Sequence, residues 1–499
     1  MAMLSNTLSI IERNGNKLPH PTLLFVYLCG SILALSAITS WFGLSATHPI
    51  TQNLIESKSL LSADGLHYIL QNTVKNFTHF APVGSVLIAI MGIGIAEHSG
   101  LIGCVLRRTV LRAPKKLTTF AVVITSVLSS IALDTGYVVL IPLAAILFQA
   151  MGRNPIAGIV AAFAGVSGGF SANIIIGPVD AILAGISTEA SHLIDPSYEV
   201  SAAGNYYFIA ASTLMIGIVG TFVTEKIVVR WLPEADDNDE TSIEVIPGEA
   251  RGLKAAGIVA LLFAAALLYS VVPETGILRH PETGSVLKSP FIQGIVVIIS
   301  LFAAVCGIAF AKYSDQALSK DFVVEAMEKH IGTMAGYIVL MFFAAQFVNY
   351  FSWSQLGTIF AINGADVLAA IKLPKIILLI LFILLAALIN LFIGSASAKW
   401  ALIAPIFVPM LLLSGISPEA TQMAYRIGDS STNIITPLMP YFGVVVAFAQ
   451  KYKKDLGMGT LISAMLPYSL CFLVAWSALL IVWVFFNIPL GPDAYAFIN

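Results

Sequence analysis

Long stretches almost without charged side chains are the feature that most constrains how this chain can fold. An α-helix rises about 1.5 Å per residue, so about 20 apolar residues cross the roughly 30 Å hydrocarbon core of a bilayer. Nine stretches reach that length, and each predicts a transmembrane helix. They cover residues 22–43, 82–105, 157–180, 206–230, 253–272, 291–311, 331–360, 420–447 and 459–486.

Composition excludes a soluble protein of this length. Charged residues make up 11% of the 499 residues, whereas soluble domains usually contain about 25%. The formal net charge of −2 provides no basic surface for nucleic acid. We therefore predict an all-α polytopic membrane protein that has the lipid bilayer, and no nucleic acid, as a partner.

Two further apolar stretches, 118–150 and 376–412, are interrupted near their middles by small and polar residues. Ser130 and Asp134 interrupt the first, and Asn390 and Gly394 interrupt the second. Irregular backbone at membrane depth is tolerated only where protein buries it or where it lines a wet cavity. We therefore predict two re-entrant hairpins in addition to the nine transmembrane helices.

The distribution of basic residues predicts the orientation. If the amino terminus is cytoplasmic and each hairpin returns to its own side, 18 of the 26 Lys and Arg residues lie on the cytoplasmic side and 6 on the other. An excess of Lys and Arg is typical of cytoplasmic loops. We thus predict a cytoplasmic amino terminus, an external carboxyl terminus, and an acidic cytoplasmic linker (231–252) between the halves 1–230 and 253–499.

A weak internal repeat relates these two halves. The frame G-x-x-S-x-N-I-I begins at Gly168 and again at Gly428, an offset of 260 residues. Each half has an interrupted hairpin, then a proline, then a span broken at the Ser/Asn motif, 157–180 in the first half and 420–447 in the second. In the predicted orientation the two units have opposite topology. Inverted repeats with discontinuous helices are typical of secondary transporters, whose binding site lies near the bilayer midplane.

Few ionisable residues lie inside the apolar stretches. Each costs roughly 2.5–3.5 kcal/mol at a helix centre on insertion scales, so such residues usually face a cavity or a partner. Arg426 and Asp429 are three residues apart on one helix face and can pair. One interpretation is a structural ion pair. The favoured one is that Arg426 attracts an anionic group while Asp429 takes up a proton or cation.

Two other intramembrane aspartates, Asp134 and Asp180, fit either a pathway lining or a structural hydrogen bond. Lys399 is interpreted as a side chain that extends from the hairpin tip to the interface. Small polar residues mark the expected helix breaks, where half-helix amino termini suit a carboxylate and amide oxygens suit sodium. The alternative is that they form interhelical hydrogen bonds. These residues are Ser171, Asn173, Ser431 and Asn433, with Asn390 and Gly394 in the second hairpin.

No Walker A motif, H-E-x-x-H motif or plausible nucleophile–base pair occurs in the sequence, so no enzyme is predicted. An intramembrane enzyme and a channel are the less favoured alternatives. A channel would carry a flux that ignores an imposed proton or sodium gradient.

Two segments resemble the AbgT family of p-aminobenzoyl-glutamate transporters: Asn390 to Trp400 (NLFIGSASAKW) and Ser417 to Pro437 (SPEATQMAYRIGDSSTNIITP). The resemblance runs across nearly the whole chain. It implies an inner-membrane homodimer with nine transmembrane helices and two hairpins. It further implies p-aminobenzoyl-glutamate import in some members and proton-driven export of sulfonamide antimetabolites in others.

At the positions that match the family's motifs, the resemblance implies that this sequence has the family's functional residues. The resemblance places Asn390 and Asp429 near a sodium ion, and with the polar residues above it gives a candidate sodium site at Asn390, Gly394, Asp429 and Asn433. The implied pathway residues are Asp180, Asn390, Ser397, Trp400, Pro418, Arg426, Asp429 and Pro437.

We therefore predict a cation-coupled secondary transporter of the bacterial inner membrane with a small aromatic or carboxylate substrate. Export of sulfonamide antimetabolites and p-aminobenzoate is the main prediction, and import of p-aminobenzoyl-glutamate is the alternative. A dicarboxylate transporter of a related inverted-repeat fold is a further alternative that would not need Trp400. No cofactor is expected beyond a bound sodium ion, with the proton as coupling ion.

Overall fold

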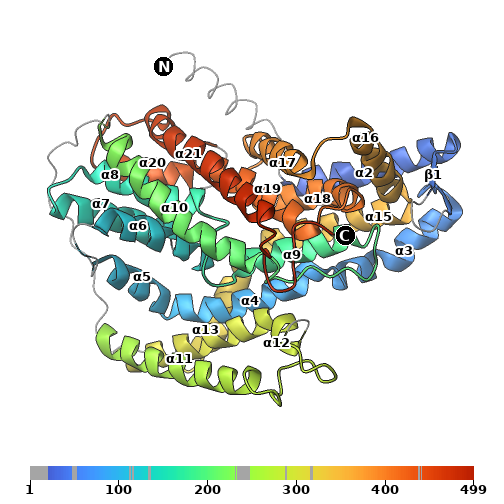
Figure 1. The fold of residues 1–499 in the computed structure, drawn as a ribbon. Coiled ribbons are helices and arrows are strands. Elements are labelled where there is room, and N and C mark those ends of the chain that lie inside the picture. The colour runs from blue at the N-terminus through green and yellow to red at the C-terminus, as the bar shows by residue number, and fades with distance from the viewer. Residues whose placement is uncertain are drawn as a thin grey trace.

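The computed structural model describes residues 21–47, 53–111, 114, 117–132, 136–230, 232, 248–286, 289–314, 319–436, 439 and 441–498. Asp134, Pro437 and most of the linker 231–252 lie outside these described residues. The described residues are mostly helical, and Figure 1 shows the helices lying in layers. The prediction of a mostly α-helical polytopic protein is confirmed.

The elements of the first half are α2 (Pro21–Trp41), β1 (Ser45–Thr47), β2 (Leu54–Glu56), α3 (Ala63–Thr78), α4 (Ala81–His98), α5 (Leu101–Leu111), α6 (Thr118–Leu128), η2 (Ser129–Ala132), η3 (Gly136–Leu140), α7 (Ile141–Ala150), α8 (Pro155–Phe163), η4 (Ala164–Gly168), α9 (Pro178–Ser191), α10 (Tyr206–Lys226) and η5 (Val228–Arg230). Among them η2 and η5 are 3₁₀-helices, and η3 and η4 are π-helical turns.

The elements of the second half are α11 (Glu249–Val271), α12 (Pro290–Gln293), α13 (Ile295–Tyr313), α14 (Phe322–Thr333), α15 (Ala335–Trp353), α16 (Leu356–Ile371), α17 (Lys375–Asn390), α18 (Ala396–Leu413), α19 (Pro418–Asn433), α20 (Phe442–Gln450) and α21 (Met458–Phe485). Helices α11, α12 and α13 form a layer of their own at one edge of the molecule (Figure 1).

Seven helices of the described chain are long and apolar enough to cross a membrane, or eight if a bent pair counts as one span. Five shorter apolar helices of 10–17 residues accompany them. The count of nine crossings stays a prediction. The seven are α2, α11, α13, α15, α18, α21, and α10 with its extension to Arg230.

Two predicted spans differ from the observed helices. The stretch 82–105 is not one straight helix: α4 and α5 meet at an angle of 62°, and Gly100 between them takes a left-handed conformation at φ 81°. The stretch 331–360 is divided after Trp353, because Gln355 is also left-handed (φ 63°) and α16 starts afresh at Leu356. A helix cannot continue through a left-handed residue, and hydrophobicity alone does not reveal that change.

Several elements escape a search for long apolar runs. Helix α3 is amphipathic and begins at Ser62, whose side chain accepts a hydrogen bond from the Gly65 amide. Strands β1 and β2 pair antiparallel, with Ser45 opposite Glu56. This short hairpin departs from the all-α prediction among the described residues, and it lies between α2 and α3, outside the apolar stretches.

An ion pair joins α14, which is not among the long apolar helices, to the carboxyl end of α4. His330 Nε2 is 3.4 Å from Glu97 Oε2, and His330 Nδ1 is 2.9 Å from the Ala326 carbonyl oxygen. The hydrogen bond to Glu97 raises the pKa of His330 above its ordinary value, burial opposes this increase, and the Ala326 carbonyl adds to it. His98 and Lys329 also lie near the ring and disfavour its charge.

We expect the stability of the protein to decrease between about pH 6 and pH 8 more steeply in the wild type than in His330→Gln. Because the pKa of His330 is higher in the folded than in the unfolded protein, its protonation stabilises the folded state. This stabilisation is fully present below the unfolded pKa of about 6.5 and is lost as pH rises through the folded pKa. The difference should be about 0.5–1 kcal/mol. Thermal unfolding in detergent measures it, with exposed His67→Gln as control. Equal pH slopes for all three proteins would contradict the prediction.

Helix breaks occur where the sequence predicts interruptions. In the first hairpin stretch α-helical geometry ends at Leu128 and is described again from Ile141, with the 3₁₀-helix η2 and the π-helical turn η3 among the described residues between them. The second stretch breaks between Asn390 and Ala396. The broken spans end regular helix at Gly168 and at Asn433. Whether these breaks belong to re-entrant hairpins stays a prediction.

Contacts in the two halves repeat at the sequence offset. Asn173 Nδ2 donates to Ser130 Oγ at 2.9 Å, and Asn433 Oδ1 accepts from Asn390 Nδ2 at 2.9 Å, so each residue and its partner are shifted by 260 positions. A Cβ on Gly165 would strike the Val123 carbonyl oxygen, and one on Gly428 would strike that of Ile383. The two carbonyl groups are 260 residues apart in the sequence, and the two glycines are 263 apart. These matches support an internal structural repeat.

Gly428→Ala is expected to lower stability, because the added methyl group would fall on the α17 backbone at Ile383 and Ala387. Overpacking of this kind costs about 1–3 kcal/mol. Gly459→Ala in α21 is the control, since a Cβ there meets nothing within 4 Å. Thermal unfolding in detergent should separate the two variants, and equal midpoints would refute the close approach of α17 and α19.

Candidate functional site

Helix α19 is the polar centre of a largely apolar protein. Helices α17, α18, α9 and α21 all contact it, and Figure 1 places it among them. All 16 of its residues are buried, although they include glutamate, glutamine, arginine, aspartate and asparagine. Buried polar side chains need partners, so the neighbours of α19 define the candidate site.

One side of α19 forms a buried ion pair with the second interrupted stretch. Asp429 Oδ1 pairs with the Lys399 ammonium, which also donates to Asn390 Oδ1. Each side chain of the pair is only 1% exposed. Asn390 Nδ2 donates to the Asp429 carbonyl oxygen at 2.7 Å and to Thr432 Oγ1 at 2.9 Å. Asn390 therefore joins the end of α17 to α19 beside the ion pair.

This arrangement corrects the interpretation of Lys399. The sequence suggested a lysine that reaches the membrane interface from the hairpin tip. The structure instead buries its ammonium next to Asp429, because α18 begins at Ala396 and its first turn packs within the protein. Removing either partner of such a pair would leave an uncompensated buried charge.

About one turn earlier on α19, a second buried ion pair joins the helix to the first half of the chain. Arg426 Nη1 lies 2.7 Å from Asp180 Oδ1, and Arg426 Nη2 donates to the Ser171 carbonyl oxygen at 3.3 Å. Asp180 Oδ2 accepts a 2.7 Å hydrogen bond from the Gly177 amide and so caps α9. The less favoured interpretation, a structural ion pair between Arg426 and Asp429, is not what the structure shows, because each of the two side chains pairs with a residue of another helix.

Trp400 packs between Tyr425 of α19 and the helix α9, where it is enclosed. Its ring stacks on Tyr425 at a centroid distance of 4.6 Å, and it is fully buried. Trp400 Nε1 donates to Ser187 Oγ at 3.0 Å and to the Leu183 carbonyl oxygen at 3.2 Å. Tyr425 in turn donates to the Ala396 carbonyl oxygen at 2.6 Å and lies 3.4 Å from Asp429 Oδ1.

The two Ser/Asn motifs meet each other. Ser430 Oγ accepts a 3.1 Å hydrogen bond from the Ser171 amide. Asn173 Oδ1 accepts from the Ile174 amide at 2.8 Å, while Ser431 Oγ donates to the carbonyl of Ile427 in its own helix. Ser171 therefore lies at the junction of the halves. Asn173 and Asn433 each make contacts within their own half, and the Ser431 hydroxyl is used within α19.

The remaining predicted residues lie around this centre or away from it. Ser397 Oγ lies 3.4 Å from Ser395 Oγ in the first turn of α18, and Gly394 precedes that helix. Pro418 is the first residue of α19, about 12 Å along the helix axis from Arg426. Pro437 and Asp134 lie outside the described residues.

The candidate sodium ligands are already engaged by protein donors. The Lys399 ammonium contacts the side-chain oxygens of Asn390 and Asp429. Asn433 Oδ1 accepts from Asn390 Nδ2. A second cation at these oxygens would be repelled by the ammonium. The residues in this conformation do not fit a sodium ion, and sodium binding stays a prediction.

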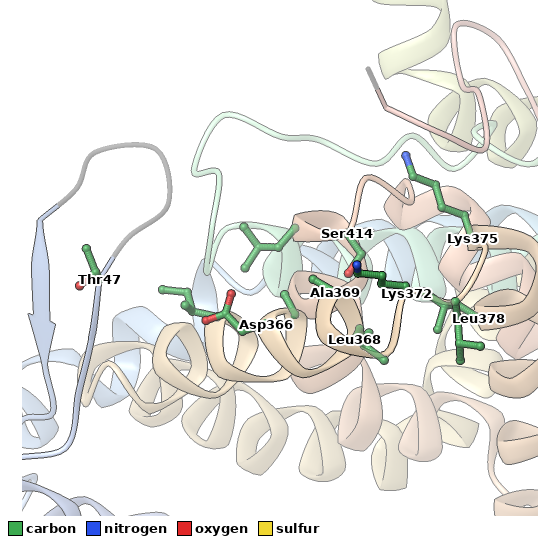
Figure 2. A pocket seen from close by; sticks show the side chains of 12 residues that line it. Thr47, Asp366, Leu368, Ala369, Lys372, Lys375, Leu378 and Ser414 are labelled. Atoms are coloured by element: carbon green, nitrogen blue, oxygen red, sulfur yellow. The ribbon is translucent and has the colours of Figure 1, made fainter.

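A cavity of about 600 Å³ lies away from the charged centre. It is lined from the end of α16 and the beginning of α17, and Figure 2 shows Asp366 nearer to Thr47 and Lys372 beside Ser414. Lys375, which also lines it, is separated from Asn390 by the length of α17, about 22 Å. The cavity is therefore not part of the site at Asp429.

The sequence analysis missed several residues of this network. Tyr425, Gln422 and Ser187 connect the charged groups to Trp400, and Lys399 was assigned elsewhere. A signal was present in α19, where polar residues recur at spacings of three and four. Those residues are Glu419, Gln422, Arg426, Asp429 and Asn433.

Comparison with known proteins places this geometry in a family. A family model described as "AbgT putative transporter family" matches residues 6–498. The chain belongs to the AbgT family. The AbgT match covers both charged pairs and the junction between the halves, so the chain is a multi-pass membrane transporter.

Individual relatives agree with this AbgT assignment. The p-aminobenzoyl-glutamate transport protein of Escherichia coli is 40% identical over 490 residues, which are 97% of this chain and 96% of that protein. The YdaH transporter of Alcanivorax borkumensis is 52% identical with a TM-score of 0.92, and the match covers 95% of this chain and 100% of that one.

A second solved structure, MtrF of Neisseria gonorrhoeae, is described as illuminating a class of antimetabolite efflux pumps. It is 50% identical with a TM-score of 0.93, and the match covers 98% of this chain and 100% of that one. The resemblance to the AbgT family that the sequence suggested is therefore confirmed.

Proposed function

We propose that this AbgT-family protein is a proton-coupled secondary transporter of the bacterial inner membrane that exports p-aminobenzoate-type compounds, including sulfonamide antimetabolites. One observation carries the proposal. Two buried ion pairs, Arg426–Asp180 and Lys399–Asp429, lie on the same polar helix, where the broken helices of the two halves meet.

Arg426 is the group that would bind an anionic substrate. Its guanidinium contacts Asp180 and the Ser171 carbonyl, and its Nε makes no hydrogen bond among the described residues. A substrate carboxylate or ionised sulfonamide would compete with Asp180 for this guanidinium, since arginine binds carboxylates through its paired donors. Trp400 and Tyr425 would contact the aromatic ring once the helices around them separate.

Asp429 is the coupling group in this proposal. Protonation of its carboxylate would remove the charge that neutralises Lys399, and the ammonium would then have to find another partner or lose its own proton. The Lys399–Asp429 ion pair joins α18 to α19. Protonation of Asp429 would weaken this contact and so would allow the two helices to change their arrangement. Proton coupling is preferred to sodium because an ammonium already contacts the candidate sodium ligands.

The repeated contacts of the two halves support an inverted-repeat transporter with alternating access around α19. We propose that the two interrupted stretches are re-entrant hairpins, that nine helices cross the membrane, and that the amino terminus is cytoplasmic and the carboxyl terminus periplasmic. A homodimer is part of the proposal on the strength of the family resemblance.

Import of p-aminobenzoyl-glutamate is the second candidate function. The name of the Escherichia coli relative, a p-aminobenzoyl-glutamate transport protein, favours it. The same charged groups would serve either direction, because a secondary transporter works between two states that are both accessible.

Flux in proteoliposomes, with pH and sodium gradients imposed separately, tests the proposal. We expect sulfamethazine and p-aminobenzoate to move against their gradients when a pH gradient is present. Movement of p-aminobenzoyl-glutamate alone would favour the importer, and movement of succinate alone would point to a dicarboxylate transporter. Flux that ignores both gradients would indicate a channel.

A further inference from the structure

A continuous polar stripe runs along α19 beyond the two ion pairs. It consists of Glu419, Gln422, Arg426, Asp429 and Asn433, and spacings of three and four residues place them on one helix face. Each is no more than 7% exposed. The stripe therefore extends from the charged centre to the first turn of the helix, where Glu419 lies.

The opposite wall of this stripe comes from α9 and the loop that follows it. Ser187 Oγ accepts from Gln422 Nε2 at 2.9 Å, and Asn205 Nδ2 donates to Gln422 Oε1 at 2.8 Å. Asp180 faces Arg426 further along. Two buried atoms on these walls, Asn205 Oδ1 and Arg426 Nε, have no hydrogen-bond partner among the described residues.

Glu419 differs from the other carboxylates of the stripe. Asp180 and Asp429 each have a cation, whereas no Lys or Arg of the described residues lies within ion-pair distance of Glu419. Its side-chain contact is Tyr198, whose hydroxyl donates to Glu419 Oε2 at 2.8 Å. A buried carboxylate without a counter-ion costs less to bury when it carries a proton.

Tyr198 connects Glu419 to the surface of the protein. It lies in the loop between α9 and α10, where the neighbouring Glu199 is exposed. Burial, and then the adjacent Glu419 carboxylate, raises the pKa of Tyr198 above its ordinary value, so the phenol stays a hydrogen-bond donor. Asp195 also acts on this phenol, and Gly204 packs against the Glu419 stem.

We propose that Glu419 is a proton-binding residue that passes the coupling proton between the aqueous side at the α9–α10 loop and Asp429. One proton from water binds the Glu419 carboxylate and neutralises it. When α19 and α9 separate during the transport cycle, the proton leaves Glu419 through water that enters between them and reaches the Asp429 carboxylate, about 15 Å along the helix axis. This inference rests on the proposed function, since it assigns a route to the coupling proton.

Glu419→Gln keeps the size and the Tyr198 contact but cannot carry the proton. In proteoliposomes with an imposed pH gradient, we expect gradient-driven p-aminobenzoate accumulation to fall at least tenfold. Counterflow exchange of p-aminobenzoate, which needs no net proton movement, should stay within twofold of the wild type and also reports a folded protein. The pH profile of transport should flatten in this variant. Glu199→Gln, in the exposed part of the same loop, is the matched control.

The outcomes separate this inference from the proposed function. If the flux through the wild-type protein does not depend on the pH gradient, the proposed function is overturned, and so is the proton route through Glu419. Wild-type coupling together with unchanged coupling in Glu419→Gln would overturn the inference alone. Equal loss of exchange and accumulation would assign Glu419 a structural role and would also overturn it. Tyr198→Phe, which keeps the carboxylate, should retain accumulation with a shifted pH profile.

Discussion

Replacing Asp429 with asparagine is expected to abolish gradient-driven transport and to destabilise the protein by about 3–5 kcal/mol. The variant leaves the Lys399 ammonium buried without its counter-charge, since each side chain of the pair is 1% exposed. The asparagine also cannot take up the coupling proton. Flux in proteoliposomes and thermal unfolding in detergent measure the two effects.

A double variant separates stability from coupling. Lys399→Met combined with Asp429→Asn removes both charges, so we expect most of the lost stability to return while gradient-driven transport stays at background. Asp455→Asn, an exposed acid-to-amide change, is the control. Transport that survives in Asp429→Asn would refute the coupling role. A double variant as unstable as the single one would show that the ion pair is not the source of the instability.

Replacing Arg426 with alanine is expected to weaken binding of p-aminobenzoate by roughly 10- to 150-fold. A hydrogen bond to a charged group contributes about 1.5–3 kcal/mol, and each 1.4 kcal/mol changes affinity tenfold. The variant also leaves Asp180 without its cation, so lower thermal stability is expected. Titration calorimetry on the purified protein measures the affinity.

Replacing Asp180 with asparagine is expected not to weaken the binding of p-aminobenzoate, in contrast to Arg426→Ala. The asparagine oxygen can still accept from the Gly177 amide, but it no longer competes as an anion for Arg426. Affinity for p-aminobenzoate should therefore equal or exceed that of the wild type, even though the unpaired guanidinium lowers stability. If Asp180→Asn weakens binding as much as Arg426→Ala does, the two residues act as one structural unit and Arg426 is not the substrate anchor.

The sequence identified the charged residues of the site, but it did not show which of them form ion pairs with each other. Arg426 and Asp429 lie three residues apart, so a local argument pairs them. In the structure Arg426 pairs with Asp180 and Asp429 pairs with Lys399, because residues three apart on a helix still diverge enough to face different neighbours. Arg426 and Asp180 are more than two hundred residues apart in the sequence, and Lys399 and Asp429 lie on different helices, so neither pairing follows from spacing along α19.

Burial was similarly decided by tertiary packing. Lys399 looks like an interfacial lysine in the sequence, since it follows a break and long side chains can reach water from there. Glu419 looks like an ordinary acidic residue in a first helical turn. Both are enclosed, because the surrounding helices and the α9–α10 loop cover the positions where water would otherwise be.

Hydrophobic length and polar interruption are local properties, so the sequence by itself determined that this is a polytopic α-helical protein. It also indicated the helix breaks at the polar interruptions, but not those at the left-handed residues Gly100 and Gln355. It also supplied Asp180, Asn390, Arg426 and Asp429 as candidate residues, since a charge or amide at membrane depth is costly wherever it points. Only the tertiary structure decided which charges meet, and it alone revealed that the polar stripe of α19 continues to Glu419. The physical reason is that ion pairs and burial depend on how close different helices lie to each other. The spacing of residues along one helix carries no information about that distance.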